Sequence, residues 1–124
     1  MKIRVEGLPP SPNATTRKHW TIQARLKKEW GEKIGWLAKA QRPKKPYKYA
    51  HIHYTISVGD NRRHDPDNLI FSVCKVSNDA LTGIVIEDDS IDNITLSFEF
   101  NRLKPRGFTI DVQERPTNES LGED

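Results

Sequence analysis

The stretch that decides the fold is YAHIHYTISVGDNRRHDPDNLIFSVCKVSNDALTG, residues 49–83. Apolar side chains occupy every second position at its start, which is the period of a half-buried strand: Ala50, Ile52, Tyr54, Ile56 and Val58. The polar run GDNRRH then forms a turn. From Pro66 onward apolar residues recur at helical spacing until Thr82 and Gly83, which end the helix. The stretch therefore predicts a strand, a turn and a helix over residues 65–81.

Elements on both sides complete the predicted fold. Residues 2–7 alternate as a short strand, and residues 21–40 place apolar side chains at helical spacing, with lysines and arginine on the other faces. Residues 94–100 and 107–112 alternate as two antiparallel strands. The order β-α-β-α-β-β predicts an α+β domain in which two main helices pack on a small mixed sheet.

The length and composition of the chain limit its class. Its 124 residues, 30% charged and 35% hydrophobic, fit one globular domain, which we assign to residues 1–113, followed by a disordered acidic tail at 114–124. No apolar run approaches the about 20 residues of a membrane span, and the first residues lack the apolar core of a secretory signal. The single cysteine, Cys74, excludes an internal disulfide and a Cys-based zinc site. We therefore expect a cytoplasmic protein without a membrane partner.

Charge is distributed unevenly along the chain. Residues 1–48 carry 13 Lys and Arg against 3 Asp and Glu, whereas residues 49–124 carry 7 against 14. Such an asymmetry is common among solvated helices. It also suits a nuclease, which needs cations for the phosphate backbone and carboxylates for the cut. Charge alone does not separate these two interpretations.

The motif RRHDPDN at residues 62–68 has a structural and a functional interpretation. Asp65 suits the N-cap of a helix, Pro66 suits its first position, and Asp67 complements the positive end of the helix dipole. These roles need no ligand. The preceding Arg62 and Arg63 add positive charge to a helix end that already favours anions, so a nucleic-acid phosphate would also fit there.

A second acidic cluster follows at residues 87–92, EDDSID. A solvated turn is the usual fate of such a run, and a calcium loop does not fit because Asn93 stands where an EF-hand has glycine. If the next strand doubles back beside the helix, Asp88 and Asp89 return to the end where Asp65 and Asp67 lie. Carboxylates that face one another require a cation, and oxygen ligands favour Mg²⁺ or Mn²⁺ over zinc.

Four segments together resemble the RusA family of Holliday-junction resolvases. They are LPPSPN at 8–13, RRHDPDN at 62–68, DALTG at 79–83 and IEDDS at 86–90, and the resemblance covers about three quarters of the chain, residues 8–100. RusA-like proteins are small, dimeric, Mg²⁺-dependent endodeoxyribonucleases of bacteria and phages. The resemblance therefore implies a homodimer that resolves branched DNA by paired symmetric nicks and needs no small-molecule cofactor.

The resemblance also assigns roles to individual residues. It implies catalytic, metal-binding carboxylates at Asp65, Asp67 and Asp89, with Asp88 as an adjacent acid in the metal site. The ion would be Mg²⁺, with Mn²⁺ as a substitute. Family members carry a lysine at the position of Phe71, and Lys75, one turn further on, is expected to take over its catalytic role.

Candidate DNA contacts surround these carboxylates. They are Arg62, Arg63, Asn13, Arg17, Lys18, Trp20, Lys27 and Lys28. Trp30, at helical spacing, is instead predicted to lie in the core. Two other functions stay open at this point. One is a non-catalytic nucleic-acid-binding module with structural carboxylates, and the other is a protein-interaction or inhibitor module whose acidic segments imitate nucleic acid.

Overall fold

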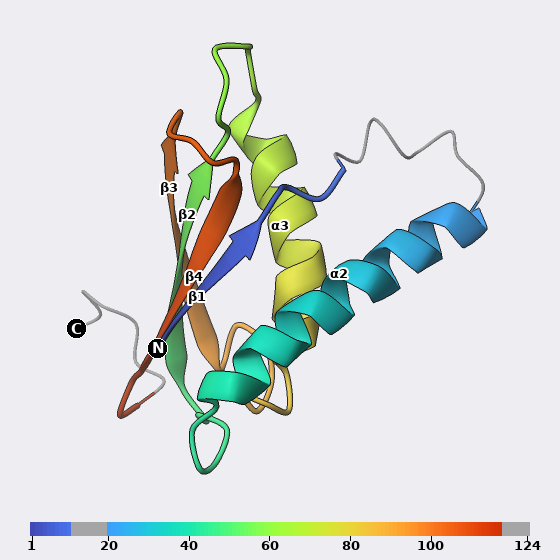
Figure 1. Cartoon of the computed structure of the whole chain (residues 1–124). Coiled ribbons are helices and arrows are strands. Elements are labelled where there is room, and N and C mark those ends of the chain that lie inside the picture. Colours follow the sequence, from blue (N-terminus) through green and yellow to red (C-terminus); the bar gives the residue numbers. More distant parts are fainter. Residues whose placement is uncertain (11–19, 118–124) are drawn as a thin grey trace.

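The computed structural model of the chain describes residues 1–10 and 20–117, with only the backbone described for residues 20–23. Two helices and four strands follow one another along the chain (Figure 1): β1 (Lys2–Glu6), α2 (Trp20–Gln41), β2 (Ala50–Ser57), α3 (Pro66–Leu81), β3 (Ile94–Asn101) and β4 (Gly107–Glu114). The predicted α+β class and the element order β-α-β-α-β-β are confirmed.

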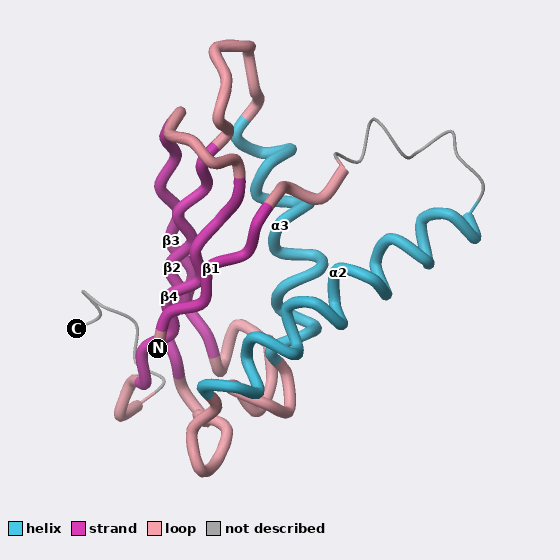
Figure 2. Tube along the Cα trace, in the orientation of Figure 1, coloured by secondary structure: helices cyan, strands magenta, loops and turns pink. Residues whose placement is uncertain are grey.

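The four strands form one mixed sheet in the order β1-β4-β2-β3 (Figure 2). β4 is antiparallel to both of its neighbours, whereas β2 and β3 are parallel and are connected through α3. We call the edge where β2 and β3 end, at Ser57 and Asn101, the carboxyl edge, and the edge where they begin, at Ala50 and Ile94, the amino edge. Because α3 leads from the end of β2 to the start of β3, it begins at the carboxyl edge and ends at the amino edge.

Both helices lie on the same face of the sheet (Figure 1), so the core forms between that face and the helices. The inward side chains of three strands, β1, β2 and β4, are fully buried, among them Ile3, Val5, Ile52, Tyr54, Ile56, Phe108 and Ile110. Ile34 and Ala38 from α2 and Val73 and Leu81 from α3 complete the core. Neither helix of the described chain is long and apolar enough to span a membrane.

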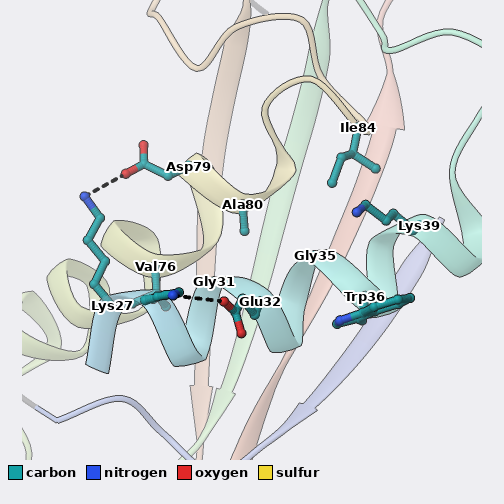
Figure 3. Close-up of a pocket in the computed structure, with 11 residues that line it drawn as sticks. Lys27, Gly31, Glu32, Gly35, Trp36, Lys39, Val76, Asp79, Ala80 and Ile84 are labelled. Atoms are coloured by element: carbon teal, nitrogen blue, oxygen red, sulfur yellow. Dashed lines mark ion pairs between the residues drawn. The ribbon is translucent and has the colours of Figure 1, made fainter. Parts of the chain in front are cut away.

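A groove of about 420 Å³ separates the two helices on their outer side. Gly31 and Gly35 of α2 line it, and a Cβ built on either glycine would meet nothing within 4 Å. Figure 3 shows the ammonium group of Lys27 reaching the carboxylate of Asp79, at a distance of 3.1 Å. Trp36, at one end of the groove, is 73% exposed.

The end of the folded domain and the edge strand β3 both differ in detail from a simple pattern. The folded domain extends past residue 113, because Glu114 is the last residue of β4 and the backbone N–H of Arg115 donates to Tyr49 O at 2.8 Å. The expected acidic tail therefore begins later, and its residues 118–124 lie outside the described part of the chain. Leu96 and Phe100 pair with Ile52 and Ile56 and therefore lie on the inward face of the sheet, but they are 40% and 39% exposed because β3 is an edge strand that neither helix fully covers.

Candidate functional site

The loop between β2 and α3 is organised around the carboxylate of Asp60. Asp60 Oδ1 accepts hydrogen bonds from the backbone N–H of Arg62, at 3.0 Å, and from Nε2 of His64, at 2.8 Å. Asp60 Oδ2 lies 3.3 Å from both Nε and Nη2 of Arg62 and 4.0 Å from Nη1 of Arg106. The hydrogen bond from His64 is the largest of the effects that lower the pKa of the Asp60 carboxyl to about 2, so this residue stays ionised at any physiological pH.

The turn between β3 and β4, residues 102–106, lies beside this loop at the carboxyl edge. Arg102 Nη1 donates to two backbone carbonyls of the loop, Asp60 O at 2.9 Å and Arg62 O at 2.8 Å. Gly7, after β1, donates its backbone N–H to Arg106 O at 2.9 Å. Three chain segments that are distant in sequence are therefore fastened together where α3 begins.

A basic cleft of about 620 Å³ opens between these segments. Its lining includes Pro9, Pro10, Arg62, Arg63, Asp65, Asn68 and Arg106. The cleft combines three arginines with a single carboxylate, so its potential is positive and favours an anionic ligand. The predicted DNA contacts Arg62 and Arg63 lie in this cleft, whereas Arg106 was not predicted. Arg106 lies in the basic turn NRLKPR, and the parallel pairing of β3 with β2 brings this turn to the carboxyl edge, so no local sequence signal places it there.

Asp65 and Asp67 flank the start of α3, as the sequence predicts. Asp65 occupies the N-cap position with extended backbone angles, and Pro66 follows at the start of the helix. The backbone carbonyl of Asp65 accepts the N–H groups of Asn68 and Leu69. The carboxylate of Asp65 makes no capping hydrogen bond and lies 3.5 Å from Nε of Arg63. The predicted position is right and the predicted capping bond is absent. The carboxylates of Asp65 and Asp67 are both exposed to solvent, and a helix cap does not use the oxygens of Asp65.

Asp88 and Asp89 lie at the opposite end of the molecule, and the expectation that they face Asp65 and Asp67 within one chain is wrong. Glu87 donates its backbone N–H to Tyr47 O at 2.9 Å, directly before β2, which fixes this segment at the amino edge. The prediction assumed that the acidic run follows a returning strand. In fact residues 82–93 turn at the end of α3, and β3 begins only at Ile94.

The length of α3 separates the two acidic clusters. A helix of 16 residues spans about 24 Å at 1.5 Å per residue. Consistent with this, the described residues contain no group of three or more His, Cys, Asp or Glu side chains arranged to hold a metal ion.

The remaining predicted site residues are distributed as follows. Lys75 is exposed on α3, and its ammonium group lies 5.1 Å from the centre of the Phe71 ring. Lys27 pairs with Asp79, and Lys28 lies 4.0 Å from Glu32, so both point along the α2–α3 groove. Asn13, Arg17 and Lys18 lie outside the described residues, as does the side chain of Trp20. Trp30 packs against the core, as predicted, and its ring stacks on that of Phe108.

The two histidines of β2 have side-chain partners on the uncovered face of the sheet. His51 lies 2.6 Å from Oγ1 of Thr95 and 2.7 Å from Oγ of Ser97, and His53 lies 2.6 Å from the same serine oxygen. The pKa of His51 is lowered, mainly because the side chain is partly buried and to a smaller extent because His53 lies beside it. These contacts join β2 to β3 and account for both residues structurally.

Comparisons with known proteins add no assignment. A scan against protein-family models matches no family, and no curated protein matches the sequence.

Proposed function

We propose that the protein is a Mg²⁺-dependent, structure-specific endodeoxyribonuclease that nicks branched DNA such as four-way junctions, in the bacterial cytoplasm and encoded by a bacterium or a phage. The observation that carries the proposal is the basic cleft at the start of α3, which three arginines line together with Asp65. Cations that attract a phosphate backbone beside carboxylates that suit a hard metal ion are the equipment of phosphodiester hydrolysis. The resemblance of RRHDPDN, DALTG and IEDDS to RusA resolvases supports the same reaction.

Asp65 and Asp67 fit a magnesium ion. Both carboxylates are exposed, and the helix cap uses neither, so their oxygens can face a cation. Proteins commonly hold Mg²⁺ through one or two carboxylates, with water and substrate phosphates as the other ligands. A bound Mg²⁺ would supply a more acidic water and neutralise developing charge. Arg62 and Arg63 would bind phosphates beside the scissile bond, and Lys75 would reach toward it along α3.

A homodimer would bring the two acidic clusters of the proposal together. In a two-fold dimer with antiparallel α3 helices, the start of one α3 lies beside the end of the other. Asp65 and Asp67 would then face Asp88 and Asp89 of the partner subunit. Each dimer would have two such sites, which matches the two strands that must be cut in a four-way junction.

Exposed apolar side chains support this mode of association. α2 packs on one side of α3, where Val76 and Asp79 line the shared groove. By helical periodicity Asp67, Phe71 and Cys74 lie on the opposite side, which turns toward β3. Phe71 is 51% exposed there, and the half-exposed Leu96 and Phe100 extend the apolar surface along the edge strand. A second copy would cover this surface and place its own acidic turn near Asp67.

The test compares cleavage and binding of a synthetic four-way junction and a linear duplex by wild type and Asp67→Asn. With Mg²⁺, wild type should nick the junction in preference to the duplex. The variant should lose cleavage by about 100-fold or more, the usual size of losing one electrostatic stabiliser of the transition state. In EDTA both proteins should bind the junction equally. Glu114→Gln, at the far end of β4, provides a control that removes a carboxylate without affecting the site.

A non-catalytic nucleic-acid-binding module is the second candidate function. The separation of the two acidic clusters within one chain favours it, because the described residues of a single copy then offer only Asp65 and Asp67 to a metal ion at the start of α3. Salt-sensitive junction binding without any Mg²⁺-dependent product would support this candidate. Cleavage that survives both Asp67→Asn and chelation would contradict the proposed carboxylate site.

A further inference from the structure

We propose that Asp60 is a positioning residue that holds Arg62 and Arg106 as the two sides of a binding site for a backbone phosphate. The inference rests on the proposed function, in that the phosphate is a phosphodiester of the DNA substrate. It goes further by assigning a role to the β3–β4 turn and to an acidic residue inside a basic site.

The first support is the charge of the cluster. Arg62, Arg63 and Arg106 line the cleft, and Arg102 lies beside it. Among the described residues, only the carboxylates of Asp60 and Asp65 lie within 4.0 Å of these arginines at the cleft. Four guanidinium groups against two carboxylates leave an excess of two positive charges, which a bound anion would neutralise.

The second support is the way the hydrogen-bond donors are used. Arg102 donates from Nη1 to two backbone carbonyls, those of Asp60 and Arg62, and so holds the β2–α3 loop in place. Arg62 and Arg106 instead contact one carboxylate oxygen, Asp60 Oδ2, from different elements. A guanidinium carries five N–H donors in a rigid fork, so each of these two arginines keeps donors for a ligand after its contact with Asp60.

The third support is that the site has a rigid frame. Arg62 and Arg106 are 44 positions apart in the sequence, and the loop and turn that carry them are joined through Arg102. Gly7 fastens the Arg106 backbone from a third segment. Two cations held by one ionised group in a fixed frame suit a tetrahedral oxyanion, because a phosphate binds best to preorganised arginine donors.

Replacement of Asp60 gives the sharpest test, because two explanations predict opposite results. Asp60→Asn raises the net charge by one, so a cleft that acts through charge alone should bind DNA more tightly. A positioning role predicts weaker binding, since Arg62 and Arg106 lose their common anchor. We expect junction affinity to fall by about tenfold, equivalent to about 1.4 kcal/mol, close to the lower limit for one charge-assisted hydrogen bond.

The experiment measures binding of a fluorescent four-way junction by the full-length protein in EDTA, over a range of salt concentrations. Glu114→Gln adds the same charge at the amino edge and should bind as wild type or slightly more tightly. Arg106→Gln should weaken binding to a similar extent as Asp60→Asn, and the double variant should lose less affinity than the sum of the two single losses, because only Arg62 is left for Asp60 to hold. Asp60→Asn binding as tightly as Glu114→Gln, or additive losses in the double variant, would overturn the proposal.

Two further readouts keep the outcome unambiguous. If Asp60→Asn fails to fold by circular dichroism, Arg106→Gln carries the test, because its side chain is exposed; unchanged junction affinity would then overturn the proposal. Cleavage with Mg²⁺ is assayed separately. Weaker binding by Asp60→Asn in a protein that never cuts would support the phosphate site and reject the nuclease. Unaltered binding by Asp60→Asn in a protein that does cut would reject the phosphate site alone.

Discussion

Lys75 reaches back along α3 toward the start of the helix. Its ammonium group lies 5.1 Å from the centre of the Phe71 ring, and Phe71 stands one turn closer to Asp67. Long helical side chains lean toward the N-terminus, so the lysine shortens its distance to the proposed reaction centre. This geometry supports Lys75 as the substitute for the lysine that RusA-like sequences carry at position 71.

Lys75→Ala should therefore reduce junction cleavage by about 100-fold while the protein stays folded, because one electrostatic stabiliser is lost. Phe71→Lys in the Lys75→Ala background should restore part of the rate. Single-turnover cleavage at saturating protein measures both effects. Lys39→Ala is the matched control, since Lys39 covers Trp36 at 5.5 Å on the other helix. Full activity of Lys75→Ala would remove the lysine from the site.

Individual residues differ in how far the sequence predicts them. The position of Asp65 before α3 follows from the pattern Asp-Pro-Asp, because proline and acidic residues favour the first helical turn. Whether its carboxylate bonds to the backbone depends on a rotamer, and here Arg63 attracts it instead. The role of Arg106 depends on strands that pair only in the folded chain, so its place in the basic cleft lies beyond local pattern.

The elements themselves are predicted well wherever one face is buried. The predicted helix over residues 65–81 is observed as Pro66–Leu81, and that over 21–40 as Trp20–Gln41, because apolar periodicity reflects burial directly. The placement of residues 82–93 could not be predicted in the same way. It depends on whether the chain turns before or after the acidic run, and Val85 and Ile86 settle this by their burial beneath the loop before β2.

Glycines in different elements should respond oppositely to alanine. In Gly107→Ala, the new Cβ would lie 2.5 Å from Val5 O in the neighbouring strand, and backbone cannot easily move. We expect a loss of about 1–3 kcal/mol of unfolding free energy, as for other overpacked sites. Gly35→Ala, in α2, should instead gain about 0.5–1 kcal/mol, because its Cβ enters open space and alanine favours helices.

Urea unfolding followed by circular dichroism measures both changes in the same assay. Each variant is a control for the other, since both add one methyl group to the chain. A stabilised Gly107→Ala would mean that β1 and β4 are less closely packed than the structure shows. A destabilised Gly35→Ala would mean that the groove between α2 and α3 is occupied in solution.

At the scale of the whole molecule, the proposed dimer predicts complementation between two inactive variants. Asp67→Asn and Asp89→Asn should each reduce cleavage by about 100-fold or more when present alone. In a mixed dimer with antiparallel α3 helices, one site collects both substitutions and the other site is intact. An equimolar mixture should therefore regain about a quarter of the wild-type nicking sites, because half of the dimers are mixed and each has one intact site.

The measurement is nicking of a labelled junction after the two variants are exchanged through mild denaturant. Differently tagged protomers verify that mixed dimers form. No recovery in a sample that contains mixed dimers would contradict a site shared between subunits. Recovery at the expected level would explain why the two acidic clusters lie at opposite ends of one chain.

In the proposed dimer, the length of α3 determines the distance between the two cuts in the DNA. In such a dimer each reaction centre lies near one end of the paired helices, so the about 24 Å length of α3 sets the spacing between the two cuts. One helical turn added to α3 would move the centres apart by about 5.4 Å, more than one base-pair step. The length of this helix, and not only the chemistry at its ends, would decide which pair of phosphates is cut.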